Sequence, residues 1–275
     1  FFDHYRWHLD DRPLHDDREI NPEVLGYIFE KYVNQKQMGA YYTKEDITGY
    51  IARSSIIPAL FDAAVAQHPQ AFAMSGQVWQ TLRQAPEHYF YGDMAHGAEQ
   101  ALPPEIAVGL NDVARRTVWS RIAPAEYALP TEIWREVVAR RERYIAARER
   151  IVCGDVHSIN DLITLNLDIA AFAQDIIAST ADPKLLLSFW QAIQHLTIVD
   201  PTCGSGAFLF AALHVLKPLY EACLDRMAVL ISDAERSGDS TTVTEVFRTV
   251  LAEVATSPNH DYFILKSIIV NNLYG

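Results

Sequence analysis

The chain has 275 residues, of which 49% are hydrophobic and 21% are charged, and its formal net charge is −12. This composition is typical of a soluble globular protein with one large or two small domains, and it excludes a collagen-like or wholly disordered chain. The apolar stretches are shorter than the roughly 20 residues of a membrane-spanning helix, so we expect no integral membrane protein. Three cysteines without a C-x-x-C pair argue against a disulfide framework or a zinc cluster and favour the cytoplasm. Because the chain begins with Phe1 rather than methionine, we expect it to be a piece of a longer protein.

The first predicted elements are two helices. Asn21 and Pro22 form a cap residue and a first-turn proline, and the apolar spacing that follows predicts a helix to about residue 33. Thr43 and Asp46 have the spacing of a capping box for a second helix. Pro58 should end or kink that helix.

The middle of the chain is predicted to be helical as well. Residues 62–130 contain Gly and Pro punctuation that predicts short helices and loops. Longer helices are predicted from the apolar spacing at 133–138, the capping box at 158–161 and the Asp-Pro pair at 182–183. Residues 232–242 are polar and contain a glycine, which predicts a surface loop.

Two patterns of histidines and charged residues carry less information. His4 and His8 are spaced like metal ligands on a helix, but no H-E-x-x-H motif accompanies them, so no metal site is expected. Residues 115–150 hold nine arginines and five glutamates, a net charge of +4 in an acidic chain. Such a stripe can follow a phosphate backbone, yet Glu136 and Arg140 stand four positions apart, as on any solvated helix. The solvated surface is the simpler interpretation.

Residues 196–209 have the pattern of a strand, a tight turn and a helix. The apolar, partly β-branched run 196–199 predicts a buried parallel strand that ends at Asp200. Gly204 and Gly206 follow, and glycines at the carboxyl end of a parallel strand let a ligand approach the backbone. Leu209 stands where a dinucleotide fingerprint needs its third glycine, and no Lys-Ser or Lys-Thr pair of an ATP-binding loop follows.

The full string from Asp200 to Leu209, Asp-Pro-Thr-Cys-Gly-Ser-Gly-Ala-Phe-Leu, resembles motif I of the S-adenosylmethionine-dependent DNA methyltransferases that modify adenine at N6. The string at 39–43, Gly-Ala-Tyr-Tyr-Thr, looks like motif X of the same enzymes, which covers the methionine end of the cofactor. Motif X precedes motif I in the γ-type, Eco57I-like arrangement, as it does here. Residues 268–275 are similar to the second strand of that fold.

The resemblance implies a cofactor site for S-adenosylmethionine. The residues carried over are Gly39, Ala40, Tyr41, Tyr42 and Thr43 of motif X, and Asp200, Pro201, Cys203, Gly204, Ser205, Gly206 and Phe208 of motif I. The backbone around the two motif I glycines would receive the methionine group, and Asp200 would accept from its ammonium or orient the turn. Phe208 would pack near the adenosine or belong to the core, and Thr43 would cap its helix or touch the cofactor carboxylate. Cys203 is expected to be a small packing residue rather than a nucleophile.

The sequence departs from the family in three ways. Lys44 follows the threonine of motif X where the family has proline, and 157 positions separate Thr43 from Asp200, which implies a long insertion. The Asn/Asp-Pro-Pro-Tyr/Phe motif, which binds a flipped adenine in these enzymes, is not in this sequence. No catalytic residue is therefore assigned, and the fragment by itself is expected to be inactive.

The expected fold is α/β, the start of a Rossmann-like class I methyltransferase sheet preceded by a mostly α-helical region. The expected segments are 1–61 with motif X, a helical insertion at 62–190, and the first β-α-β part of the cofactor domain at 191–275. Expected partners are double-stranded DNA and other subunits of a restriction-modification or BREX- or DISARM-like phage-defence system. A methyltransferase acting on RNA or protein glutamine, or a noncatalytic scaffold in a defence complex, would fit the same cofactor turn.

Overall fold

The computed structural model describes residues 6–7, 19–20, 43–238 and 241–275. The predicted helix at 21–33, the histidines at positions 4 and 8, and motif X residues 39–42 lie outside this part. Near the start of the chain, β1 (Arg6–Trp7) pairs in parallel with β2 (Glu19–Ile20).

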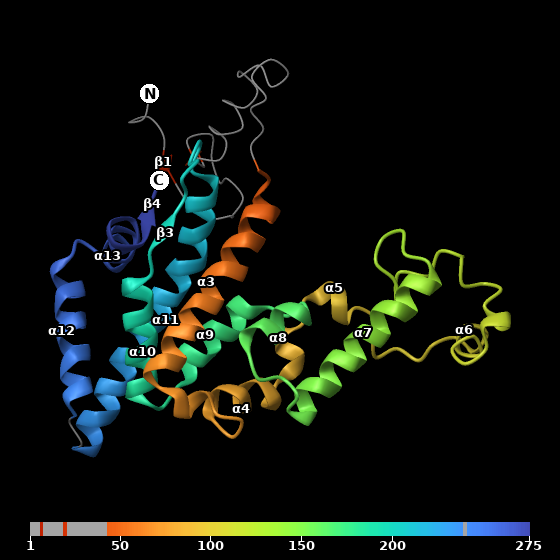
Figure 1. Ribbon diagram of the computed structural model, residues 1–275, viewed down its shortest axis with the longest axis horizontal. Helices are drawn as coiled ribbons and strands as arrows, with labels where there is room; N and C mark the ends of the chain where they lie inside the picture. Colours follow the sequence, from red (N-terminus) through yellow and green to blue (C-terminus); the bar gives the residue numbers. More distant parts are fainter. Residues whose placement is uncertain (1–5, 8–18, 21–42, 239–240) are drawn as a thin grey trace, which may run out of the picture.

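Helices dominate the described residues, and Figure 1 shows their arrangement. In chain order the elements are α3 (Glu45–Gln67), η2 (Pro69–Phe72), α4 (Gln77–Gln84), η3 (Pro86–Tyr89), α5 (Gly92–Ala95), α6 (Pro104–Ala107), η4 (Val113–Arg115), α7 (Trp134–Cys153), α8 (Ile159–Thr164), α9 (Ile169–Ser179), α10 (Pro183–His195), β3 (Ile198–Val199), α11 (Ala207–Ser237), α12 (Thr242–Thr256), α13 (His260–Ser267), the π-helix η5 (Ile268–Asn272) and β4 (Leu273–Tyr274). The short helices and loops predicted for 62–130 are confirmed. The helices expected after residues 130, 158 and 182 are confirmed too, and Ser158 forms its capping box with Asp161.

The main body is a helical bundle built around α11. This helix packs against α3, α9, α10 and α12. Aromatic rings fill the centre: the Phe61 ring lies 5.8 Å from that of Phe172 and 5.3 Å from that of Phe189, centroid to centroid. The continuous core includes residues on both sides of positions 61 and 190, so packing does not mark the expected segment boundaries, which stay predictions.

Helix α11 is also apolar enough and long enough to cross a membrane by those two criteria alone. Its residues Leu216, Tyr220 and Met227 are buried in the bundle core. A core helix of a globular protein meets the same criteria, so this property does not indicate a membrane span.

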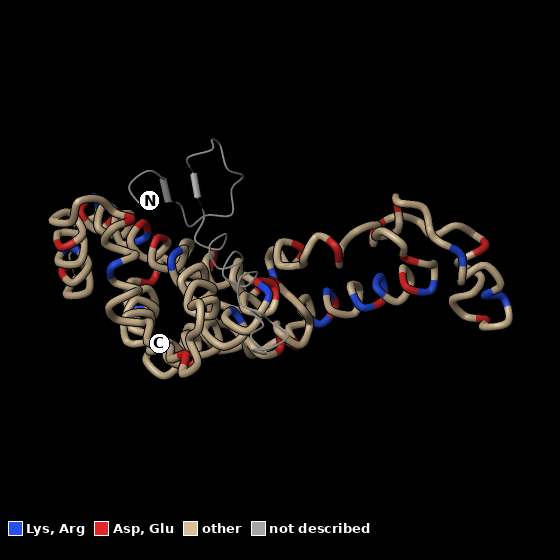
Figure 2. The backbone as a smooth tube through the Cα atoms, turned by 90° about the horizontal axis from the view of Figure 1, so that it is seen from above, with Lys and Arg blue, Asp and Glu red and all other residues tan. Residues whose placement is uncertain are grey.

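A long arm, defined as residues 96–140, extends from the bundle (Figures 1 and 2). It has a small core of its own, made of Ile106, Trp119, Ala123, Ala128, Trp134, Val137 and Val138. The buried Arg140 guanidinium closes this core: it pairs with Glu132, 2.8 Å from Nη2 to Oε2, and donates to the carbonyls of His96 and Tyr127. Arg140 therefore pairs with Glu132 and not with Glu136, the partner suggested by helical spacing.

The strand pair beside α11 is short and parallel. Ile198 is in register with Leu273, and Val199 with Tyr274. The predicted parallel pairing is confirmed. The predicted burial of the strand is wrong, because Val199 is 63% exposed. Among the described residues, β4 is the one strand that pairs with β3. Only the last part of the second predicted strand is extended, since η5 occupies Ile268–Asn272.

Three local predictions are wrong, one of them in part. Thr43 does not cap α3: the helix begins at Glu45, and Lys44 stands at the cap without a side-chain hydrogen bond. Of the two effects predicted for Pro58, ending the helix is wrong and a kink stays a prediction: α3 continues to Gln67, because one lost backbone hydrogen bond is offset by the buried apolar face on both sides of the proline. The loop expected from residue 232 begins later, since α11 continues to Ser237 and ends at a glycine with positive φ.

Candidate functional site

The glycine turn follows β3 and leads into α11, as the sequence predicts. Asp200 comes directly after β3, and its N–H donates to the carbonyl of Tyr274 at 2.8 Å. Gly206 is the N-cap of α11, and its N–H donates to the carbonyl of Cys203 at 2.8 Å. The turn is therefore fixed at one end by the strand pair and at the other by the helix.

The two glycines are required for the backbone conformation rather than for space. Gly204 has φ of +54° and Gly206 has φ of +81°, and this left-handed region costs other residues about 1–2 kcal/mol. A Cβ at either position would meet its nearest neighbour at an ordinary contact distance, 3.6 Å for Gly204 and 3.7 Å for Gly206. Gly204 and Ser205 are exposed, so the backbone of the turn is open to a ligand.

The Asp200 carboxylate is buried and only half satisfied. Its Oδ1 accepts from the Thr202 N–H at 3.0 Å. Its Oδ2 is buried without a hydrogen-bond partner, the one such side-chain atom in the described part of the chain. An unsatisfied buried polar atom costs about 1–3 kcal/mol, and more when it is charged. A ligand with an N–H or O–H donor would remove this cost.

A groove of about 500 Å³ opens beside this carboxylate, and we name it the turn groove. Helix α3 forms one wall, β3 and the start of the turn form the floor, and α11 forms the other wall. Its lining is Ile51, Ala52, Ser55, Ile56 and Ala59 of α3, residues 196–202, and Phe208, Leu209 and Ala212 of α11. The turn groove is therefore mostly apolar and has Asp200 in its lining, as expected for a ligand with one apolar and one cationic part.

The structure brings only some of the predicted residues to the turn groove. Asp200, Pro201 and Phe208 line it, whereas Cys203, Gly204, Ser205 and Gly206 belong to the adjoining turn and are not part of its lining. Thr43 is exposed just before α3 and is not part of the lining either. Cys203 packs under the end of β4, because a Cβ on Gly275 would stand 2.7 Å from its Sγ. The remaining motif X residues, Gly39, Ala40, Tyr41 and Tyr42, lie outside the described residues.

Sequence reasoning missed Asn272, which fixes β4 beside β3. The side chain is fully buried: its Nδ2 donates to the carbonyls of Ile193 and Leu196, each at 2.7 Å. Its Oδ1 accepts from the Tyr220 hydroxyl at 3.0 Å. Burial raises the pKa of Tyr220, so this hydroxyl remains a donor at all ordinary pH values. A polar residue at the end of the apolar run 268–270 was the available signal.

The α3 wall was also missed as part of the site. Ser55 and Ala59 lie well after motif X in the sequence, and no local pattern assigns them to a ligand. Their small side chains leave space between α3 and α11, and Ser55 adds a hydroxyl to the lining. They reach the site because α3 packs along α11 over much of its length.

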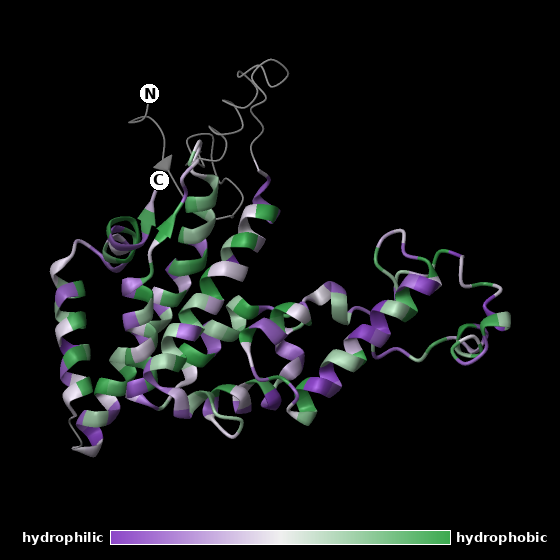
Figure 3. Cartoon of the chain, viewed as in Figure 1, coloured by the Kyte–Doolittle hydropathy of each residue, from purple (hydrophilic) through white to green (hydrophobic). Residues whose placement is uncertain are grey.

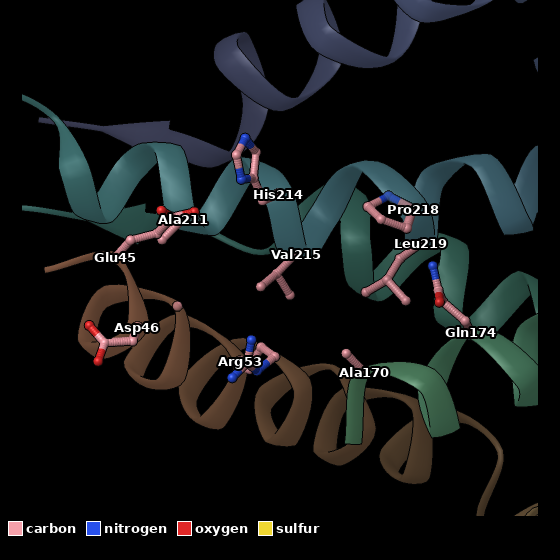
Figure 4. Close-up of a pocket in the computed structure, with 11 residues that line it drawn as sticks. Glu45, Asp46, Arg53, Ala170, Gln174, Ala211, His214, Val215, Pro218 and Leu219 are labelled. Atoms are coloured by element: carbon pink, nitrogen blue, oxygen red, sulfur yellow. The ribbon is translucent and has the colours of Figure 1, made fainter. Parts of the chain in front are cut away.

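A second cavity, of about 610 Å³, lies between α3, α9 and α11 (Figure 4). Figure 4 shows Arg53 on α3 facing Val215 and Leu219 on α11 across the space. Glu45 and Asp46, both exposed, contribute acidic groups to its lining. No buried side-chain atom in the described part of its lining lacks a partner, so the turn groove is the stronger candidate for a small-molecule site.

One comparison with known proteins gives a partial match. Over 68 residues, 22% of this chain, the sequence is 38% identical to a protein of Methanocaldococcus jannaschii that is provisionally named a type II restriction enzyme and methyltransferase. The chain is related, over this segment, to a restriction-modification methyltransferase. It covers only 6% of that relative's length. No family model and no solved structure matches the chain.

Proposed function

We propose that the turn groove and its glycine turn bind S-adenosylmethionine, and that the chain is the cofactor-binding part of an adenine-N6 DNA methyltransferase of the γ type. The observation that carries the proposal is the unpartnered Oδ2 of Asp200 next to an exposed glycine turn. The motif I string and the partial similarity to a restriction-modification methyltransferase support it. The Rossmann-like sheet belongs to the same proposal, with β3 and β4 as its first parallel pair.

The residues present suit a zwitterionic amino-acid tail. Asp200 would accept a hydrogen bond from the ammonium, which would satisfy its Oδ2. The free N–H groups of the first turn of α11, which has no side-chain cap, would face the carboxylate, because a helix amino end favours an anion. Phe208 and the α3 wall would cover the apolar part of the ligand. When bound, S-adenosylmethionine supplies a methyl group activated by the sulfonium.

The chain's own contribution is to position this cofactor. Tight positioning of reacting groups supplies a large share of the rate enhancement in direct transfer reactions. The strand pair holds Asp200 through its backbone, and Asn272 holds the strand pair. The acceptor base would be a flipped adenine in double-stranded DNA, bound outside the described residues.

Isothermal titration calorimetry of the chain with S-adenosylmethionine tests cofactor binding. Asp200→Asn keeps the shape and the acceptor for Thr202 but removes the charge that faces the ammonium. Loss of one charge-assisted hydrogen bond of about 1.5–3 kcal/mol should weaken binding by about 10- to 150-fold. Asp155→Asn, an exposed change with the same loss of charge, should leave affinity unchanged.

Two outcomes would count against the proposal. Equal affinity of the Asp200→Asn variant and the wild type would remove Asp200 from the site. No measurable heat from the folded wild-type protein would favour a noncatalytic scaffold.

The methyl acceptor is tested separately. A full-length protein containing this chain should transfer a labelled methyl group from S-adenosylmethionine to adenine N6 in a DNA duplex. Transfer to RNA or to glutamine instead would replace DNA as the substrate.

A further inference from the structure

A second groove, of about 630 Å³, lies at the base of the arm, and we name it the α7 groove. Its lining is Arg140, Arg143, Ala146, Ala147 and Arg150 of α7, Tyr91, Asp93 and Met94 around the start of α5, Leu129, and Thr164, Leu165 and Asn166 at the end of α8. Three arginines and one aspartate line it, in a chain whose net charge is −12. Figure 2 shows the basic residues repeating along α7, and Figure 3 shows hydrophilic colours on this helix.

Among the described residues, two of the three arginines have no ion-pair partner. Arg140 is neutralised by Glu132. Arg143 and Arg150 are exposed, and neither forms an ion pair or a side-chain hydrogen bond in the part of the chain that the structure describes. Asp161 interacts electrostatically with Arg150, but its carboxylate already accepts hydrogen bonds within the capping box of α8.

The sequence of α7 prevents neutralisation within the helix. Ion-pair partners on a helix stand three or four positions away. The positions three and four before Arg143 are Arg140 and Ala139, and those after it are Ala146 and Ala147; both alanines also precede Arg150 at these spacings. The glutamates of α7, at 136, 142 and 149, are not part of the described lining. On a helix face that is merely solvated, acidic and basic residues would alternate at these spacings. Arg143 and Arg150 have no acidic residue three or four positions away.

The spacing of the two free guanidinium groups suits a regular polyanion. Seven residues are almost two helical turns, so Arg143 and Arg150 lie on the same face, about 10 Å apart along the helix axis. One DNA strand advances about 3.4 Å per phosphate along the duplex axis, so the two arginines would meet phosphates about three steps apart. Tyr91 and Asn166, whose side chains carry uncharged donors, are part of the same lining.

We propose that the α7 groove binds the phosphate backbone of duplex DNA, with Arg143 and Arg150 each contacting one phosphate. This inference rests on the proposed function, which makes DNA the substrate, and it assigns part of the inserted region to contact with that substrate. The contact is independent of base sequence, because it involves phosphates and not base edges. The α7 groove and the turn groove share no lining residue, so substitutions in the α7 groove should leave cofactor binding unchanged.

The test measures fluorescence anisotropy of a labelled DNA duplex with the chain, at salt concentrations between about 50 and 200 mM. Each phosphate contact contributes about 0.9 to the slope of log affinity against log salt. The double variant Arg143→Gln/Arg150→Gln should therefore bind more weakly and lower the magnitude of the slope by about 1.8. The matched control Arg121→Gln/Arg135→Gln removes two exposed charges on the arm outside the α7 groove and should change the slope by less than half of that.

An equal change of slope in both double variants would overturn the proposal, because it would show a general charge effect. Absence of duplex binding by the wild type at low salt, or tighter arginine-dependent binding of duplex RNA, would also overturn it. Calorimetry with S-adenosylmethionine on the same samples separates the two proposals. If the cofactor binds but the two double variants change the salt slope equally, only the proposal for the α7 groove is wrong. If DNA binding depends on Arg143 and Arg150 but the cofactor does not bind, only the proposed function is wrong.

Discussion

Replacement of Asn272 by alanine tests the hydrogen bonds that fix the strand pair. The change removes two donated hydrogen bonds, to the carbonyls of Ile193 and Leu196, and one accepted from the Tyr220 hydroxyl. All of these groups are distant in sequence from residue 272, so the amide connects the end of α10, just before β3, with α11.

The expected cost follows from these contacts. A buried hydrogen bond contributes about 1 kcal/mol net, and each partner left unsatisfied adds to the loss. Three bonds give a loss of about 3 kcal/mol in the free energy of unfolding. For a chain of this size that corresponds to a fall in Tm of about 6–12 °C.

Differential scanning fluorimetry measures the change in Tm, and hydrogen exchange locates it. The Asp200 amide, which donates to Tyr274 across the strand pair, should exchange faster in Asn272→Ala. The matched control is Asn271→Ala, because Asn271 is exposed and surface changes stay within about 0.5 kcal/mol. A fall in Tm of less than about 2 °C for Asn272→Ala, or an equal fall for both variants, would refute the reasoning.

Three further predictions concern the turn, the arm and the cysteines. Gly206→Ala should destabilise the protein by about 1–2 kcal/mol, since alanine must adopt φ of +81°, and an unchanged urea midpoint would contradict this. The hydrogen bond from Arg140 is the main cause that lowers the pKa of Glu132, against the opposing effect of burial. The ion pair should therefore stabilise the arm at pH values above the ordinary pKa of a glutamate, and this stabilisation should be lost as the pH falls through the lowered pKa. Amide hydrogen exchange in α7 should then be faster at acid pH. Exchange that does not depend on pH, after correction for the intrinsic rate, would argue against the pair. Burial raises the pKa of the Cys223 thiol, so iodoacetamide should label the exposed Cys153 and leave Cys223 unmodified until the protein is denatured, and early labelling of Cys223 would disprove its burial.

Local sequence signals predicted the elements whose causes are local. The Asp182-Pro183 pair begins α10, and the glycines at 204 and 206 adopt the left-handed conformation that a tight turn requires. Each of these depends on residues within a few positions of one another, so the pattern can be read without the fold. Local reasoning could not decide whether Pro58 would end its helix, because the packing of the whole α3 face outweighs one missing hydrogen bond.

The site required the tertiary structure. The sequence by itself determined the glycine turn and the helix that follows it, because interactions between neighbouring residues fix them. Only the fold decided that α3 would form a wall of the turn groove, that Asn272 would reach Ile193 across 79 positions, and that Arg140 would be buried while Arg143 remained free. Contacts between residues far apart in the chain form when apolar surfaces pack together, and the choice among many possible packings is not encoded in any short window of sequence.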